Sequence, residues 1–374
     1  MRKDNPLRSI QGFGQSIWLD FIRRRMILEG ELQQLLAQDG LRGVTSNPSI
    51  FEQVIAGSGD YGEDIRLLSR QGRSVEDIHD TLTIKDIGMA ADMFRPLYEH
   101  SDGKHGLVSL EINPHLAYDE EATLEEARRL WQVLNRPNIM LKVPATDAGL
   151  SCIKQLIGAG INVNVTLLFG LPRYRKAAEA YIEGLEARAA DKKPINWIAS
   201  VASFFVSRID VMIDGILRHR EDQPELAVQA AQLYGQAGIA SAKLAFQIYS
   251  EIFEGERFRA LLDKGAQPQR LLWASTSTKS PKESPIKYVE ALIGPSTINA
   301  LPMETLNAYR EQGQPEMRLT QDLQTARQVM EGLRGLDINI DKVALSLEEQ
   351  GVLRFAQSYD RLMQTIEEAR SDAL

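Results

Sequence analysis

The chain has 374 residues, of which 43% are hydrophobic and 25% charged, a composition typical of a folded globular protein. Its formal net charge of −8 argues against nucleic-acid or membrane-surface binding through a large basic patch. Cys152 is the only cysteine, no apolar run approaches membrane-spanning length, and residues 1–6 do not lead into the apolar core of a secretion signal. We therefore expect a cytoplasmic protein without internal disulfides.

Short apolar runs alternate with amphipathic stretches along the whole chain. Eight runs have the length and composition of buried strands, namely 16–20, 43–47, 106–112, 139–144, 161–169, 197–203, 270–276 and 296–301. The helices expected between and after them are 22–30, 31–38, 74–99, 120–134, 148–157, 173–190, 206–217, one alanine-rich helix from the polar break 220–224 to about 253, 319–334 and 346–370. The sequence thus predicts regular strand–helix alternation.

This alternation predicts the fold class. Repeated strand–helix units require parallel strands with right-handed crossovers, and eight units favour closure into a (β/α)8 TIM barrel over an open sheet. No GxGxxG motif follows the first run, which removes the usual reason to expect a dinucleotide-binding sheet. We expect an α/β protein with one domain over 1–374, the barrel at about 14–312 and a helical extension at about 319–374. The last helix carries an apolar stripe and should dock on the barrel, either as a structural element or as a partial lid.

Lys142, inside the apolar run 139–144, is the most informative residue of the sequence. A lysine is almost never fully buried unless its charge is paired or its chemistry is used. It is therefore either half of a structural ion pair or an amine held in a dry pocket, where an uncharged amine can attack a ketone and form a Schiff base. The run 161–169 alternates small polar and apolar residues, which indicates that Asn162, Asn164 and Thr166 line a cavity.

In a barrel of this kind, the site lies at the carboxyl ends of the strands. The polar residues predicted there are Asp20, Asn47, Glu111, Lys142, Asn164, Thr166, Ser203, Ser275 and Thr276. Schiff-base chemistry on a ketose needs an amine, a proton donor for the C2 oxygen and a base for the C4 hydroxyl, and one lysine with two carboxylates meets this need. Each carboxylate taken alone could equally cap the next helix.

A substrate phosphate would need a local basic site. Arg208, at a helix start after the sixth run, and Lys279, in the loop after the seventh, are the candidates, although Lys279 could simply be exposed. The five histidines show no paired spacing and no thiol cluster accompanies them, so we do not expect a transition-metal site. An enzyme that binds a magnesium ion through Asp20 and Glu111 is an alternative, but it would not explain the lysine at position 142.

Six stretches resemble the transaldolases of the pentose phosphate pathway, in particular a bacterial branch. They are 14–20 (GQSIWLD), 43–51 (GVTSNPSIF), 108–111 (VSLE), 140–146 (MLKVPAT), 162–169 (NVNVTLLF) and 203–210 (SFFVSRID). The resemblance implies that Lys142 forms a Schiff base with sedoheptulose 7-phosphate or fructose 6-phosphate. It further implies that the dihydroxyacetone unit passes to glyceraldehyde 3-phosphate or erythrose 4-phosphate, with no metal or organic cofactor.

The resemblance also implies residue roles. Asp20 would be the base for C3–C4 cleavage, and Glu111, acting through a water held with Thr166, would be the acid and base of imine formation and hydrolysis. The residues implied to bind substrate are Asn47, Asn164 and Ser203 for the dihydroxyacetone hydroxyls and Arg208 for the phosphate. Many members of the family place a phosphate-binding arginine after the seventh strand, where this chain has Ser-Thr-Ser-Thr-Lys at 275–279. We hypothesise that Ser275 and Lys279 replace it.

Two rival functions remain open at this stage. An aldolase in the narrow sense, which releases free dihydroxyacetone, would share Lys142 and Asp20. A non-catalytic sugar-phosphate sensor would have no need of a buried amine. The sequence leaves the preferred donor open, and it does not distinguish a monomer from a homodimer.

Overall fold

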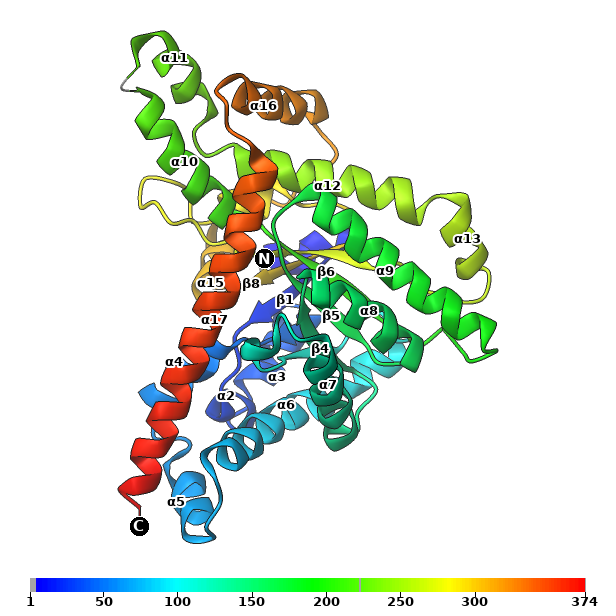
Figure 1. Cartoon of the computed structure of the whole chain (residues 1–374), viewed down its shortest axis with the longest axis vertical. Coiled ribbons are helices and arrows are strands. Elements are labelled where there is room, and N and C mark those ends of the chain that lie inside the picture. Colours follow the sequence, from blue (N-terminus) through cyan, green and yellow to red (C-terminus); the bar gives the residue numbers. More distant parts are fainter. Residues whose placement is uncertain (1–4, 222, 374) are drawn as a thin grey trace.

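A computed structural model describes residues 5–221 and 223–373 of the chain (Figure 1). Residues 1–4 and residue 222 of the predicted polar break lie outside this description. Within the described residues, parallel strands form one closed barrel in the order of the sequence, and β8 pairs with β1. The strands are β1 (Gln15–Asp20), β2 (Gly43–Thr45), β3 (Leu107–Glu111), β4 (Ile139–Pro144), β5 (Val163–Leu168), β6 (Ser200–Phe205), β7 (Arg270–Ala274) and β8 (Thr297–Leu301). The (β/α)8 fold class is confirmed.

Helices surround the barrel. They are α1 (Pro6–Ser9), η1 (Ile10–Phe13), α2 (Arg24–Leu28), α3 (Glu31–Gln38), α4 (Pro48–Gly57), α5 (Gly62–Arg70), α6 (Val75–His100), η2 (Pro114–Leu116), α7 (Glu120–Leu134), α8 (Asp147–Ala159), α9 (Leu171–Ala190), α10 (Ser207–Glu221), α11 (Pro224–Leu233), α12 (Ala237–Phe253), α13 (Glu256–Leu262), α14 (Lys287–Ala291), α15 (Met303–Gln312), α16 (Leu323–Gly335) and α17 (Ile340–Ser371). Among the described residues, no helix combines the length and the hydropathy needed to cross a bilayer.

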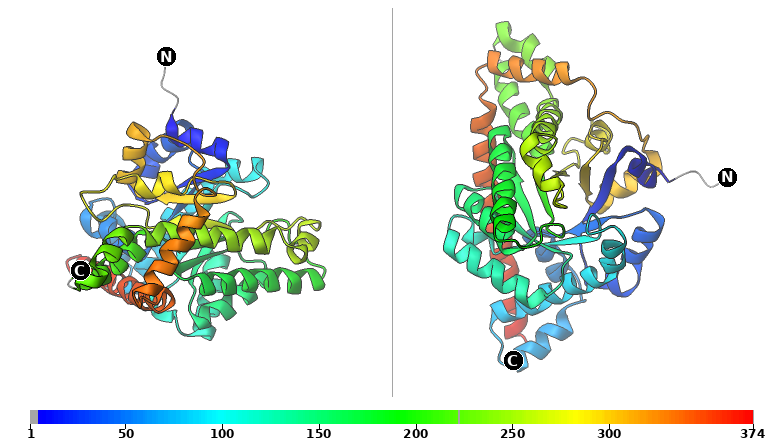
Figure 2. Two further views of the ribbon diagram at one scale, coloured as in Figure 1. Left: turned by 90° about the horizontal axis from the view of Figure 1, so that it is seen from above. Right: turned by 90° about the vertical axis from the view of Figure 1, so that its right-hand side faces the viewer.

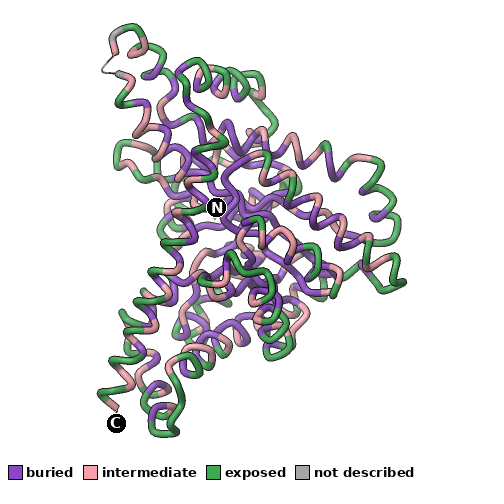
Figure 3. The backbone as a smooth tube through the Cα atoms, viewed as in Figure 1, coloured by how far each residue is buried: buried purple, intermediate pink, exposed green. Residues whose placement is uncertain are grey.

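Local sequence explains how strands give way to helices near the site. Asn47 ends β2 and caps α4, because its side-chain oxygen accepts a hydrogen bond from the Ile50 amide and Pro48 occupies the first helical turn. Thr146 caps α8 in the same way, through the Gly149 amide. Figure 3 shows the buried residues concentrated in the barrel strands and on the helix faces that cover them. These caps and apolar faces hold the carboxyl ends of β2 and β4 in fixed positions.

Several expected bounds differ from the structure: the second strand ends at Thr45 instead of 47, and the last helix begins at Ile340 instead of 346. The sixth strand begins at Ser200 instead of 197, because residues 195–198 form a turn. Trp197 lies in this turn, is 47% exposed and contacts the Tyr98 ring. The alanine-rich helix is divided into α11 and α12. Gly235 interrupts it with a φ of 63°, and its amide donates to Asp214 Oδ1. The helix α5 was not predicted.

The last helix packs along the barrel, as the apolar stripe predicts (Figure 1). It crosses α4, where Ser358 Oγ lies 2.8 Å from Ser49 Oγ and Arg361 forms an ion pair with Glu52. Phe355, from the same helix, is buried and reaches the cavity at the carboxyl ends of the strands. Both views of Figure 2 place α17 (red) and α1 (dark blue) on opposite sides of the molecule.

Candidate active site

The carboxyl ends of the strands surround a cavity of about 200 Å³, which we call the mouth cavity. The predicted site residues that line it are Asp20, Asn47, Lys142, Thr166, Ser203, Arg208, Ser275 and Lys279. Glu111 lies beside this cavity, next to Lys142 across the β3–β4 pairing, and Asn164 lies beneath it. The fold thus brings together, in one place, residues that are spread over most of the chain.

Lys142 is 6% exposed, and its amine reaches the mouth cavity from β4. Nζ donates a hydrogen bond of 2.8 Å to the Ser46 carbonyl oxygen and lies 3.5 Å from Glu111 Oε2. The structural ion pair considered from the sequence is therefore present. The same nitrogen also faces a cavity of the size of a small sugar, so the ion pair and a chemical role are compatible.

Glu111 is a buried carboxyl at the end of β3, with a side chain 7% exposed. Burial raises its pKa to about 7; the Lys142 charge lowers the pKa in part, and Asp20 adds to the rise. Among the described residues, neither Glu111 Oε2 nor the buried Thr166 Oγ1 has a hydrogen-bond partner. A carboxyl with a pKa near neutrality can both give and accept a proton under ordinary conditions.

Asp20 is the second carboxyl of the site and ends β1. Burial raises its pKa, while the positive charges of Lys142 and Lys279 lower it. The two carboxyls therefore come from different strands, Glu111 from β3, which pairs with the Lys142 strand, and Asp20 from β1, which does not. Such separate placement allows them separate proton-transfer duties.

A cationic end of the mouth cavity lies where α10 begins. Arg208 is the second residue of that helix, and its pKa is lowered by burial and by the charge of Arg354. Lys279 Nζ donates to Ser277 Oγ at 2.6 Å, and the pKa of Lys279 is lowered by burial and by Arg208. Within the described residues, neither cation forms an ion pair with a carboxylate. Two unneutralised cations at a helix start suit an anionic group such as a phosphate.

Ser275 connects the loop after β7 to the start of α10 at the cationic end of the mouth cavity. It has a φ of 54°, its Oγ lies 2.9 Å from Ser207 Oγ, and its carbonyl oxygen accepts from the Ser207 amide. The strained backbone turns the loop after β7 toward the start of α10. Ser275 therefore lines the cavity and also positions the helix that carries Arg208.

Three residues of the predicted set have surroundings that differ from the expectation. Asn164 does not line the mouth cavity, because its amide donates to Ser109 Oγ and its oxygen accepts from Ser203 Oγ at 2.6 Å. Asn162 lies before β5 and binds the backbone of Pro137, Ile139 and Ala199, so the expectation that it lines the cavity is wrong. Thr276 turns away to Asn299.

Other residues of the mouth cavity were not singled out from the sequence. They are Thr45, Ser49, Phe205, Leu272, Ala274, Ala300, Pro302 and Phe355. Phe355 is separated from the strands by a long stretch of chain, and only the apolar stripe of the last helix pointed to it. No group of three or more histidine, cysteine, aspartate or glutamate side chains among the described residues is arranged to hold a metal ion.

The comparisons with known proteins agree with this geometry. The family model described as Transaldolase/Fructose-6-phosphate aldolase matches residues 17–366. A transaldolase of Trichodesmium erythraeum is 43% identical over 371 residues, which cover 97% of each chain, and one of Thiobacillus denitrificans is 43% identical over 362 residues, which cover 97% of this chain and 99% of the relative. A transaldolase of Saccharopolyspora erythraea is 41% identical over 374 residues and the full length of both chains. Because the likeness runs from the first barrel strand to the last helix, this chain belongs to the transaldolase family.

Proposed function

We propose that this protein is a transaldolase that carries a dihydroxyacetone unit on Lys142 from a ketose phosphate to an aldose phosphate. The observation that carries the proposal is the position of the Lys142 amine, which lies in the mouth cavity between a carboxyl with a pKa near 7 and a cationic end. The proposed donors are fructose 6-phosphate and sedoheptulose 7-phosphate, and the acceptors erythrose 4-phosphate and glyceraldehyde 3-phosphate. We also propose a single cytoplasmic domain that uses no metal, as a monomer or homodimer.

The proposed reaction begins at Lys142. The Lys142 nitrogen passes a proton to Glu111 and adds to the C2 carbonyl carbon of the donor, and Glu111 returns the proton to the C2 oxygen, which leaves as water. Asp20 then removes the proton of the C4 hydroxyl, the C3–C4 bond breaks, and its electrons enter the iminium to give an enamine. The aldose phosphate departs while the three-carbon unit stays on Lys142. Addition to the acceptor and hydrolysis of the imine run through the same groups in reverse.

The proposed binding groups divide the substrate between two ends. Asn47 and Ser203 would bind the hydroxyls of the dihydroxyacetone unit, and Asn164 would act through its hydrogen bond to Ser203 Oγ. Arg208 and Lys279 would hold the phosphate at the start of α10. This division explains why the amine and the cations lie in one elongated cavity.

Because of Glu111, we expect the rate of imine formation to fall on the acidic side of about pH 7, which gives the pH–rate profile an acidic limb. Below its pKa of about 7 the carboxyl is protonated and cannot accept the proton that the Lys142 ammonium must lose, so the rate should rise as pH increases through that value. Glu111→Gln should lower the rate by about 10²-fold and remove this limb. The measurement is single-turnover borohydride trapping with fructose 6-phosphate at a series of pH values.

Glu348→Gln is the matched control for this experiment. Burial also raises the pKa of Glu348 to about 7, but this residue pairs with Arg173 and lies outside the mouth cavity. Its replacement should leave the acidic limb in place. Retention of the limb in Glu111→Gln, or its loss in Glu348→Gln, would assign the ionisation to another group.

Lys279→Ala is expected to raise the KM for fructose 6-phosphate about tenfold with a smaller effect on kcat, because a cation on the phosphate binds substrate and transition state alike. Steady-state kinetics with erythrose 4-phosphate as acceptor measures both constants. Lys282→Ala, an exposed lysine of the same loop, is the control and should change neither. An unchanged KM in Lys279→Ala would remove this residue from the phosphate site.

The effect of an acceptor on the rate of fructose 6-phosphate consumption distinguishes a transaldolase from the rival aldolase. A transaldolase keeps the enamine until an aldose phosphate arrives, so erythrose 4-phosphate should accelerate the consumption of fructose 6-phosphate greatly. The full-length relatives named transaldolase favour this outcome over release of free dihydroxyacetone. Equal consumption with and without acceptor would support the aldolase.

A further inference from the structure

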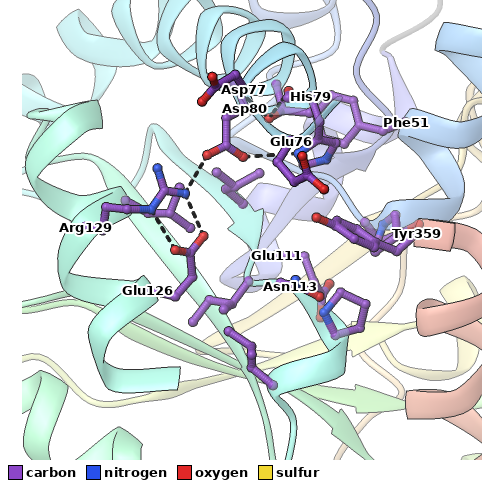
Figure 4. Close-up of a pocket in the computed structure, with 18 residues that line it drawn as sticks. Phe51, Glu76, Asp77, His79, Asp80, Glu111, Asn113, Glu126, Arg129 and Tyr359 are labelled. Carbon is purple, nitrogen blue, oxygen red and sulfur yellow. Dashed lines mark hydrogen bonds and ion pairs between the residues drawn. The ribbon is translucent and has the colours of Figure 1, made fainter. Parts of the chain in front are cut away.

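A second cavity, of about 390 Å³, lies where β3 ends and has Glu111 in its lining. It is enclosed by the carboxyl end of β3, by α4, α6, η2 and α7, and by α17 (Figure 4). Glu111 lines it, and Asn47 lines both this cavity and the mouth cavity. We call it the Glu111 chamber. The proposed acid and base of the reaction therefore lines a cavity that adjoins the mouth cavity at Asn47 and has a different set of walls.

The walls of the Glu111 chamber are acidic. In addition to Glu111, the carboxylates that line it are Glu76, Asp77, Asp80 and Glu126. Among the described residues of the lining, Arg129 is the only arginine or lysine, and both Asp80 and Glu126 bind it, at 2.6 and 2.7 Å. In Figure 4 these three side chains form one wall, and Tyr359 of α17 stands on the opposite one. An anionic sugar phosphate would be repelled here, whereas the cationic end of the mouth cavity attracts it.

The chamber reaches the surface, and its lining is mixed: polar side chains lead inward beside the apolar Phe51, Leu110, Ile112, Leu116 and Leu130. Glu76, Asp77 and Arg129 are exposed, while Thr83 is 2% exposed and lies deeper on the same helix as the two acids. The polar side chains that lead from the exposed rim to the buried carboxyl offer water the several hydrogen-bond partners that it needs. A divalent cation does not suit it, because no group of three ligating side chains among the described residues is arranged for one.

We propose that the Glu111 chamber is the path by which water and protons exchange with Glu111 while a sugar phosphate fills the mouth cavity. This inference rests on the proposed function. When the imine forms, the C2 oxygen of the donor takes two protons and leaves as one water molecule, and a C=N bond replaces the C=O bond. When the product imine is hydrolysed, one water adds to C2, Glu111 accepts one of its protons and passes it to the Lys142 nitrogen, and the C–N bond breaks as the C2 carbonyl forms. Each turnover thus releases one water and consumes one.

The mouth cavity offers a bound substrate little room to let water pass. It holds only about 200 Å³, Phe355 covers one side of it, and Arg208 lies at its phosphate end. A six- or seven-carbon sugar phosphate bound there would block the direct route between Glu111 and solvent. The chamber supplies the other route, with its charge arranged to admit water and keep the substrate out.

The test narrows the chamber without touching a proposed catalytic or binding residue. Thr83→Phe places a ring in it from α6, and Leu116→Trp does so from η2 on another wall. The enzyme is loaded with the three-carbon unit from fructose 6-phosphate, mixed with erythrose 4-phosphate, quenched with borohydride at successive times, and weighed as intact protein. Reduction fixes whatever imine is present, so the mass distinguishes the three-carbon adduct, the seven-carbon adduct and the free protein.

In both narrowed variants the three-carbon adduct should disappear as fast as in the unmodified protein, because carbon–carbon bond formation consumes no water. The seven-carbon adduct should persist several-fold longer, because its hydrolysis needs one. Thr83→Val, which keeps the volume, and Thr81→Phe, on the exposed face of α6, are the controls and should behave like the unmodified protein.

Unchanged lifetimes of the seven-carbon adduct would overturn the role of the chamber, and Leu116→Trp decides the matter if Thr83→Phe does not fold. An equal slowing in Thr81→Phe would also overturn it. If the unmodified protein forms no adduct at all, the proposed function itself fails, and this outcome is distinct from ordinary adduct formation with unchanged lifetimes.

Discussion

Replacement of Lys142 by arginine is expected to lower turnover by at least about 10⁴-fold and to abolish labelling of the protein by fructose 6-phosphate and borohydride. Arginine keeps the positive charge beside Glu111 and can still donate to the Ser46 carbonyl, so the packing of β4 should survive. A guanidinium does not lose its proton in proteins, however, and therefore cannot add to the C2 carbonyl of a ketose. Steady-state kinetics and intact-protein mass after reduction measure the two effects.

Lys243→Arg is the matched control for Lys142→Arg. Lys243 is also buried, at 8% exposed, and its Nζ donates to a backbone carbonyl, that of Gln321, at 2.7 Å. It belongs to α12 and lies away from the mouth cavity. This variant should retain both activity and labelling. Full turnover in Lys142→Arg, or loss of labelling in Lys243→Arg, would show that the reactive amine has been assigned wrongly.

Replacement of Asp20 by asparagine should separate imine formation from carbon–carbon cleavage. The donor imine should still form, because Glu111 and Lys142 are intact, but the C4 hydroxyl would have no base, and kcat should fall by about 10²- to 10⁴-fold. Borohydride quenching with fructose 6-phosphate alone should then give the six-carbon adduct, where the unmodified protein gives the three-carbon one. Intact-protein mass distinguishes the two adducts.

Glu111→Gln provides the contrast for Asp20→Asn. It should slow the appearance of every adduct, since the C2 oxygen would lack its acid, but the adduct that does form should be the three-carbon one. A three-carbon adduct that appears at the normal rate in Asp20→Asn would exclude Asp20 as the base of cleavage. Identical adduct patterns in the two variants would argue against separate duties for the two carboxyls.

The barrel could be predicted from the sequence because its strands are short apolar runs with clear breaks. Lys142 stood out because a charged residue in such a run conflicts with burial. The start of the sixth strand was misplaced, since composition alone cannot distinguish an apolar strand from an apolar turn, and Trp197 belongs to the turn. The break at Gly235 depends on a hydrogen bond to Asp214, which no local pattern reveals.

Most of the candidate site followed from one rule, that strand ends of a barrel meet at one opening. The rule predicts that Asn164 lies near the opening. It does not reveal that the side-chain amide group of Asn164 is hydrogen-bonded to Ser109 and Ser203. The Glu111 chamber could not be predicted from the sequence for a different reason. Its walls come from segments as distant as Thr83 and Tyr359, and only their packing creates the space between them.

Phe355 also links the site to the order in which the chain is made. Every strand of the barrel precedes it, so during synthesis on a ribosome the barrel can close while the segment that covers its mouth is still being translated. The contacts of α17 with Ser49 and Glu52 then join this late helix to α4, which is translated much earlier. A polypeptide released before this helix is complete would keep the strands of the barrel but lack the Phe355 side chain that lines the mouth cavity.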